Sequence, residues 1–428
     1  MGMVRVSGPA VVLLLQAIIG KVPVARTATL AMFREAGGDA IDRGIVLYFP
    51  GPNSYTGEDV CELQGHGGPV VMQRLLQRCL ELGCRLANPG EFTQRAYLNE
   101  KLDLAQAESV ADLIDASSAE AARSAARSLT GEFSTKVGGI RDALVELRIH
   151  VEACIDFPEE EIDSADRLAH TQKLAALRAQ LARLMREAKQ GAVLRDGLTV
   201  VLIGRPNVGK SSLLNNLAGE DVAIVSPIPG TTRDHVRATI LLEGVPIHLI
   251  DTAGLRDTNE EVERIGIERT WTAISRAGAA LLIAETGEMI GLQEAEILAK
   301  LPPSLPIVWV YNKIDIHAQH ASRIGVGRDT QILASALTGE GVDLIREWLL
   351  ETAGWQPSGE GVFMARTRHL VALRDAAAHL DIAAMAMAQF DLFAEELRLA
   401  QGALSLVTGE FTPDDLLGEI FGKFCIGK

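Results

Sequence analysis

Residues 204–211 read Gly-Arg-Pro-Asn-Val-Gly-Lys-Ser and match the phosphate-loop pattern G-x-x-x-x-G-K-[ST]. They follow an apolar run, Leu198–Ile203, that predicts a strand, and they precede Ser212–Leu217, which predicts a helix. In such a loop the backbone N–H groups surround a β-phosphate, and the helix N-terminus adds partial positive charge. Lys210 can reach the β- and γ-phosphates, and the Ser211 hydroxyl can ligate Mg2+. The sequence therefore predicts an α/β domain that binds a nucleoside triphosphate.

Two later segments indicate which base the domain selects. Asn312-Lys-Ile-Asp315 follows an apolar run that ends at Tyr311, and the Asp315 carboxylate can accept hydrogen bonds from guanine N1–H and N2–H₂. Adenine lacks that pair of donors, so GTP is favoured over ATP. Ser335-Ala336-Leu337 is predicted to contact guanine O6 through backbone N–H groups.

A third segment, Asp251-Thr-Ala-Gly254, follows the run that ends at Ile250. Asp251 is expected to hold Mg2+ through water, and the Gly254 N–H to sense the γ-phosphate. The predicted nucleotide-binding residues are Asn207, Val208, Gly209, Lys210, Ser211, Ser212, Thr232, Asp251, Thr252, Ala253, Gly254, Asn312, Lys313, Asp315, Ser335, Ala336 and Leu337.

The residue that orients the attacking water is not a glutamine. In Ras-type proteins that glutamine follows the glycine of the D-x-x-G segment, and here Leu255 stands there, followed by Arg256 as a surface cation. A carboxylate a few residues on could serve instead. Glu260 and Glu261 are candidates, and both also fit as ordinary charges at a helix N-terminus.

Residues 219–234 form a polar, proline-punctuated loop that predicts a switch segment, ordered by GTP and released on hydrolysis. Thr232 can bind Mg2+ when the γ-phosphate is present, and Arg233 is the local candidate for an arginine finger.

The length of the chain and the changes in composition along it predict several domains, since 428 residues correspond to about three. We expect an α+β domain over residues 1–98, a helical domain over 99–193 and 355–428, and the strand-rich nucleotide-binding domain, residues 197–353, inserted into it.

The net charge of −15 argues against a general nucleic-acid coat. Five scattered cysteines favour reduced thiols over disulfides or zinc. The longest apolar run, Val11–Ile19, is too short to span a bilayer, so a cytoplasmic protein is predicted.

Further segments extend the pattern over nearly the whole chain, and together they resemble the MnmE (TrmE) family of tRNA-modifying GTPases among the TrmE–Era–EngA-like GTPases. They are Thr231-Thr-Arg-Asp234, residues 261–268, residues 50–59, 63–68 and 99–106, and the terminal Cys425-Ile-Gly-Lys428. The resemblance implies a folate-binding N-terminal domain that drives homodimerisation, and a G domain inserted into a discontinuous helical domain. It also implies an FAD-binding partner, MnmG (GidA), in a heterotetramer-type complex. On this resemblance, the two proteins together are expected to install an aminomethyl-type group at C5 of the wobble uridine of certain tRNAs, with a one-carbon unit from 5-formyl- or methylene-tetrahydrofolate.

The resemblance also assigns residues to an ion, a water and a folate. The K+ site of the family falls on Asn207, Ser226, Ile228 and Thr231, and a K+ there would supply the charge of an arginine finger. The water-orienting glutamate of the family aligns with Glu263, which with Lys210 forms the predicted catalytic pair. The folate contacts carry over to Arg5, Glu62, Lys101 and Lys428. Cys425 is either a thiol used in the modification or an incidental cysteine.

Two departures from the family are visible. Before the stretch that corresponds to Met1-Gly-Met-Val-Arg5, the family usually has an opening strand with a Pro-Pro-Gly-Arg-Gly-type loop, so an incomplete folate pocket is expected. Glu285 stands where an aspartate normally ends a strand, with little functional effect expected. The alternatives are a GTP-controlled RNA-binding or ribosome-assembly switch, for which a basic RNA-binding module would be needed, and a truncated, non-functional chain. Folate binding by the chain would distinguish a tRNA-modifying GTPase from both of these alternatives.

Overall fold

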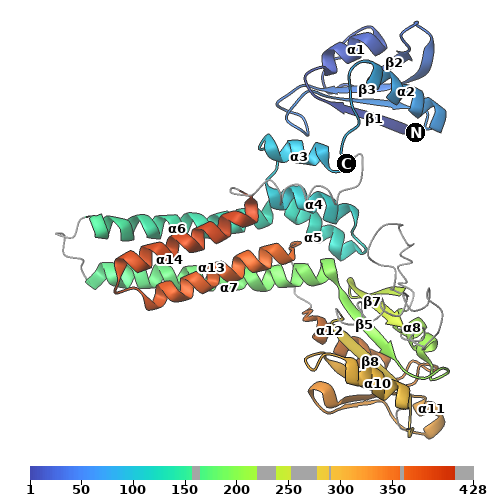
Figure 1. Ribbon diagram of the computed structural model, residues 1–428, viewed down its shortest axis with the longest axis vertical. Coiled ribbons are helices and arrows are strands. Elements are labelled where there is room, and N and C mark those ends of the chain that lie inside the picture. The colour runs from blue at the N-terminus through green and yellow to red at the C-terminus, as the bar shows by residue number, and fades with distance from the viewer. Residues whose placement is uncertain (157–163, 219–237, 252–276, 289–290, 357–360, 410–428) are drawn as a thin grey trace. The chain divides into compact units, whose positions relative to one another are not determined.

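The computed structural model describes residues 1–156, 164–218, 238–251, 277–288, 291–356 and 361–409 (Figure 1). The chain divides into two compact units. One contains residues 1–111, 128–174 and 378–428, and the other contains residues 112–127 and 175–377. The domain boundaries predicted from the composition of the sequence differ from the boundaries of these two units. They stay a prediction.

The first unit begins with a four-stranded antiparallel sheet in the order β1-β4-β3-β2. Its strands are β1 (Gly2–Ser7), β2 (Thr29–Arg34), β3 (Ala40–Phe49) and β4 (Val60–Gly65). Alternate residues point to one face and are buried under α1 (Val11–Ile19) and α2 (Pro69–Glu81), for example Val46 and Leu63 beneath Leu15. The mixed α/β content predicted for this part of the chain is confirmed. The apolar run at residues 11–19 is therefore a core helix.

Helices make up the rest of the first unit. They include the short α3 (Glu91–Leu98) and the long α6 (Glu132–Asp156), and α6 packs against α14 (Phe390–Thr408) (Figure 1). α6 buries Ile140, Leu144, Leu147 and Val151, whose spacing of three and four residues predicts a helix with one apolar face. Four helices run across the division between the units: α4 (Leu104–Ile114), α5 (Ala119–Leu129), α7 (Ser164–Asp196) and α13 (Thr367–Met385). Across the described parts of the chain, none of the helices combines the length and the apolarity needed to cross a bilayer.

The second unit is built on a seven-stranded sheet in the order β10-β11-β9-β8-β5-β7-β6. Its strands are β5 (Leu198–Ile203), β6 (Ala238–Leu242), β7 (Val245–Asp251), β8 (Ala279–Glu285), β9 (Ile307–Asn312), β10 (Ser322–Ile324) and β11 (Thr330–Leu333). The five central strands are parallel, and β6 and β10 are antiparallel edges. A tight turn at Glu243-Gly244, with φ of 49° and 82°, joins β6 to β7.

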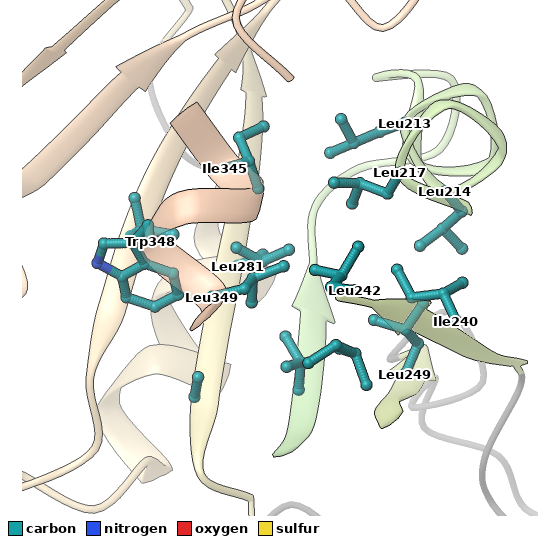
Figure 2. Packing of buried hydrophobic residues seen from close by; sticks show 14 of the residues in the cluster. Leu213, Leu214, Leu217, Ile240, Leu242, Leu249, Leu281, Ile345, Trp348 and Leu349 are labelled. Atoms are coloured by element: carbon teal, nitrogen blue, oxygen red, sulfur yellow. The ribbon is translucent and has the colours of Figure 1, made fainter. Parts of the chain in front are cut away.

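Helices cover both faces of this sheet, which explains why its central strands are almost continuously apolar. On one face, Leu213 and Leu217 of α8 (Lys210–Ala218) and Trp348 and Leu349 of α12 (Val342–Ala353) pack against the strands. Figure 2 shows this cluster, with Trp348 and Leu349 near Leu281. On the other face, residues of α10 (Leu292–Lys300) pack against β5 and β8. The α/β domain predicted for this part of the chain is confirmed.

Candidate functional site

The phosphate-loop segment lies between the end of β5 and the start of α8. Its backbone bends through left-handed conformations at Asn207 (φ 65°) and Gly209 (φ 96°). A side chain at Gly204 would lie 2.4 Å from the Ile283 carbonyl oxygen, and one at Gly209 would lie 2.2 Å from Asn312 Nδ2, so both positions need glycine. Lys210 Nζ donates a hydrogen bond to the Gly204 carbonyl, which folds the lysine over the loop.

Asn312, at the end of β9, joins the phosphate loop to the segment after β11. Its Nδ2 donates to the Val208 carbonyl at 2.7 Å, and its Oδ1 accepts from the Ala336 N–H at 2.8 Å. From the other side, Asn216 of α8 donates to the Ala336 carbonyl at 2.7 Å. The carboxyl ends of parallel strands meet at one edge of a sheet, and three separate segments are hydrogen-bonded together there.

Asp315 lies at the start of a short helix, α11 (Ile314–His317), and is exposed. Its Oδ1 accepts a hydrogen bond of 2.6 Å from the Ser335 hydroxyl, which orients the carboxylate. The Ala336 N–H, which we expected to contact guanine O6, is already bonded to Asn312, whereas the Leu337 N–H has only a long contact of 3.3 Å to Ser335 Oγ. Leu337 itself is 81% exposed. The structure thus brings together Val208, Asn312, Asp315, Ser335 and Ala336.

Lys313 lies beside these residues in a left-handed conformation (φ 69°), and its Nζ is 2.5 Å from Glu285 Oε2 at the end of β8. The hydrogen bond from Lys313 lowers the pKa of the Glu285 carboxyl below its ordinary value, while partial desolvation opposes this shift. Thr286 donates to the Asn312 carbonyl from both its hydroxyl (2.8 Å) and its N–H (3.0 Å).

The remaining predicted residues of this site are only partly described. Ser211 and Ser212 lie in the first turn of α8, and Asp251 is the last residue of β7, paired in register with Leu202. The predictions for Ser226, Ile228, Thr231, Thr232, Thr252, Ala253, Gly254 and Glu263 fall outside the described residues, as do those for Arg233, Leu255, Arg256, Glu260 and Glu261.

Three contacts at this site were not predicted from the sequence: those of Asn216, Glu285 and Thr286. Glu285 and Thr286 directly follow an apolar strand, and that position at the carboxyl edge of a parallel sheet is the signal that could have found them. Asn216 gives no comparable signal, because it occupies the interior of a helix.

A second group of predicted residues lies in the first unit. Arg5 of β1 pairs with Glu62 of β4 across the sheet, with Nη2 and Nε at 2.7 Å and 3.0 Å from Glu62 Oε1. The Arg5 guanidinium also lies 5.8 Å from the centre of the Phe92 ring. Lys101 is exposed, and its Cγ would lie 3.4 Å from a side chain at Gly57. No contact joins Lys101 to the Arg5–Glu62 pair within the described residues, and Lys428 and Cys425 lie outside them.

Arg5 lines a cavity of about 360 Å³ between β1, the end of α2 and α3. Phe92 and Cys79 contribute apolar walls, and Arg95 and Glu91 contribute charge. Hydrogen bonds from Arg85 lower the pKa of Glu91 to about 2 despite its burial. Burial raises the pKa of the Cys79 thiol to about 12, so this cysteine is a packing residue and not a nucleophile. A cavity of this size with convergent polar groups can hold a small organic molecule.

The fold and the first site together define a class of protein. A mostly parallel sheet carries a glycine-dependent phosphate loop after one strand and an Asn-Lys-x-Asp segment after another, and the Asn312 amide bonds the two together. These are the features of a P-loop GTPase.

Comparisons with known proteins narrow the class to a family. The model of the MnmE helical domain matches residues 104–425, and the model of the GTP-binding protein TrmE N-terminus matches residues 1–101. The chain is 58% identical over 428 residues to the tRNA modification GTPase MnmE of Azoarcus sp. (strain BH72), covering 100% of this chain and 95% of that one. It is 57% identical over 428 residues, with the same coverage, to the tRNA modification GTPase MnmE of Chromobacterium violaceum. Among solved structures, it is similar to a variant of Aquifex aeolicus Era bound to GDP and aluminium fluoride (26% identity, 42% of this chain and 66% of that chain, TM-score 0.27). The chain belongs to the MnmE (TrmE) family of tRNA modification GTPases.

Proposed function

We propose that this protein is a K+-activated GTPase that, with an FAD-binding partner, modifies C5 of the wobble uridine of certain tRNAs using a tetrahydrofolate-derived one-carbon unit. The observation that carries the GTPase part is the Asn312 amide, which bonds the phosphate loop on one side and the Ser335–Leu337 segment on the other. A nucleotide that spans the two therefore meets a preorganised site.

The nucleotide roles follow from the chemistry of each residue. The phosphate-loop N–H groups and Lys210 hold the β- and γ-phosphates, and Ser211 with Thr232 ligates Mg2+. The Ser335 hydroxyl occupies one lone pair of Asp315 and leaves the carboxylate free to accept the two guanine donors. A Mg2+ held by Ser211 and Thr232 would offset negative charge on the phosphate oxygens.

For the K+ site we propose Asn207, Ser226, Ile228 and Thr231. Asn207 supports this proposal because it is exposed and held at φ 65° in the phosphate loop, where its side-chain oxygen can reach an ion beside the phosphates. A cation there offsets the charge that develops as the terminal phosphate leaves. Glu263 then orients the attacking water.

For the folate derivative we propose Arg5, Glu62, Lys101 and Lys428. The support is the Arg5–Glu62 pair beside the Arg5-lined cavity, since a carboxylate can bind the N–H edge of a pterin and a guanidinium can bind a carboxylate. Among these candidates, only Arg5 lines the cavity within the described residues.

We propose that the protein acts as a homodimer through its N-terminal sheet. The sheet carries three exposed apolar side chains, Met3, Leu30 and Met32, which are 47%, 59% and 36% exposed. Met3 lies on the same face of β1 as Arg5, because side chains two residues apart on a strand point the same way. Leu30→Glu should turn a dimer into a monomer in light scattering, and an unchanged mass would contradict this surface.

Hydrolysis measured in two salts tests the K+ claim. With the full chain at equal ionic strength, replacing Na+ by K+ should raise the rate of GTP hydrolysis at least about tenfold. Equal rates would refute it.

Equilibrium dialysis with 5-formyl-tetrahydrofolate tests the folate claim. Arg5→Ala should weaken binding, whereas Arg34→Ala, in an exposed arginine of the same sheet that bonds the Gly38 carbonyl, should not. An intact chain that hydrolyses GTP and binds no folate would favour the RNA-binding switch instead.

A further inference from the structure

Glu285 stands between two basic side chains of the guanine-selecting segment. Its Oε2 lies 2.5 Å from Lys313 Nζ, and its Oε1 lies 3.9 Å from His317 Nε2. Lys313 and His317 lie two residues before and two residues after Asp315. One carboxylate therefore faces both ends of the short segment that carries Asp315.

The backbone of this segment needs such support. Lys313 adopts φ 69°, a left-handed conformation that non-glycine residues rarely adopt. Glu285 and Asn312 are direct partners in the parallel register of β8 and β9, and Thr286, which is buried, bonds the Asn312 carbonyl twice. Residues 285 and 286 thus hold residues 312 and 313, one by an ion pair and the other by hydrogen bonds.

We infer that Glu285 is a positioning residue for guanine-nucleotide binding, which acts by holding Lys313 beside the base-binding residues. The inference rests on the proposed GTP site. Both side chains of the pair are 29% exposed, and ion pairs this open contribute little to global stability. The effect of Glu285 should therefore appear in nucleotide retention and not in unfolding temperature. The expectation from the sequence that this departure from aspartate has little functional effect stays a prediction, and glutamate keeps the carboxylate on which the inference depends.

A double-mutant cycle on the full chain tests the inference. The readout is the dissociation rate of a fluorescent N-methylanthraniloyl GDP, with Glu285→Ala, Lys313→Ala and the double variant compared. Glu285→Ala should raise the dissociation rate about fivefold to tenfold in the native background and less than about twofold in the Lys313→Ala background. At saturating GTP the kcat should change little while KM rises.

Three comparisons make the outcome decisive. Glu296→Ala, an exposed glutamate of α10, should leave dissociation unchanged. Glu285→Gln keeps the size of the side chain without its charge and serves if Glu285→Ala does not fold; it should also speed dissociation. Unchanged dissociation in the Glu285 variants, or an equal effect in both backgrounds, would overturn the inference while leaving the GTP site standing. Failure of the native chain to bind the probe would overturn the proposed function itself.

Discussion

The side-chain amide of Asn312 donates a hydrogen bond of 2.7 Å to the backbone carbonyl of Val208 in the phosphate loop. Its oxygen accepts from the Ala336 N–H at 2.8 Å, and Asn312 is 2% exposed. The phosphate loop and the segment proposed to bind the base therefore share one buried amide. Movement of either segment must break or stretch one of its two hydrogen bonds.

Asn312→Ala should weaken GTP and GDP binding at least about tenfold, because a buried carbonyl and a buried N–H each lose their partner at about 1–3 kcal/mol. Isothermal titration calorimetry with GDP measures the change. The matched control is Asn215→Ala on the exposed side of α8, which should bind as the native chain does. Native-like affinity in the Asn312 variant would show that the shared amide does not organise the site.

Gly209→Ala should abolish nucleotide binding without unfolding the chain. The added methyl would lie 2.2 Å from Asn312 Nδ2, and the backbone φ of 96° disfavours any side chain. Nucleotide titration and circular dichroism together report the two effects. Gly139→Ala, where a methyl group meets nothing within 4 Å in α6, should change neither.

Glu263→Ala should leave GTP affinity nearly unchanged and lower the hydrolysis rate by roughly 100-fold or more, since the proposed role is to orient water and not to bind nucleotide. Single-turnover hydrolysis and equilibrium binding separate the two quantities. Glu261→Ala is the neighbouring comparison. If it causes the collapse instead, the water-orienting role belongs to Glu261.

Asp112→Ala should destabilise the second unit by about 3–5 kcal/mol, because it removes a buried carboxylate from between two guanidinium groups. Asp112 is 8% exposed and accepts hydrogen bonds from Arg195 Nε at 3.0 Å and Arg366 Nη2 at 2.7 Å. Calorimetric unfolding measures the loss. Asp115→Ala, at an exposed aspartate three residues on, should change the free energy of unfolding little. Equal losses in the two variants would show that the contacts of Asp112 with the two arginines add no specific stability.

Glu91 should make the α3 region sensitive to acid. Its pKa is lowered from 4.5 to about 2, mainly by hydrogen bonds from Arg85, with Arg95 and the Asn88 N–H contributing. A lowered folded-state pKa means stability that is fully present above about pH 4.5 and lost as the pH falls toward 2. Hydrogen exchange of α3 amides, corrected for intrinsic rates, should lose protection over that window. The pH dependence of this protection should flatten in Glu91→Gln. An equally steep loss of protection in that variant would show that other groups cause the acid sensitivity.

The spacing of residues predicted the architecture of the second unit well. Short apolar runs separated by helical stretches predict a parallel sheet, and each motif directly follows a strand, which places all of them at one edge. Such patterns are local, because burial on both faces imposes apolar residues on each strand wherever its neighbours lie. Likewise, the three- and four-residue spacing in α6 predicted its buried face.

These local patterns did not predict which residues far apart in the sequence come into contact. Asn216 meets Ala336 across 120 residues, Asn312 meets Val208 across 104, and Arg366 meets Asp112 across 254. Glu285 was noticed only as a departure from a pattern, although it faces Lys313 28 residues away. The sequence by itself determined which strands and loops form and which chemistry each loop offers, since these depend on neighbours along the chain. Only the tertiary structure decided which side chains meet, because a hydrogen bond or ion pair requires atoms within about 3 Å, and that proximity comes from packing distant segments together.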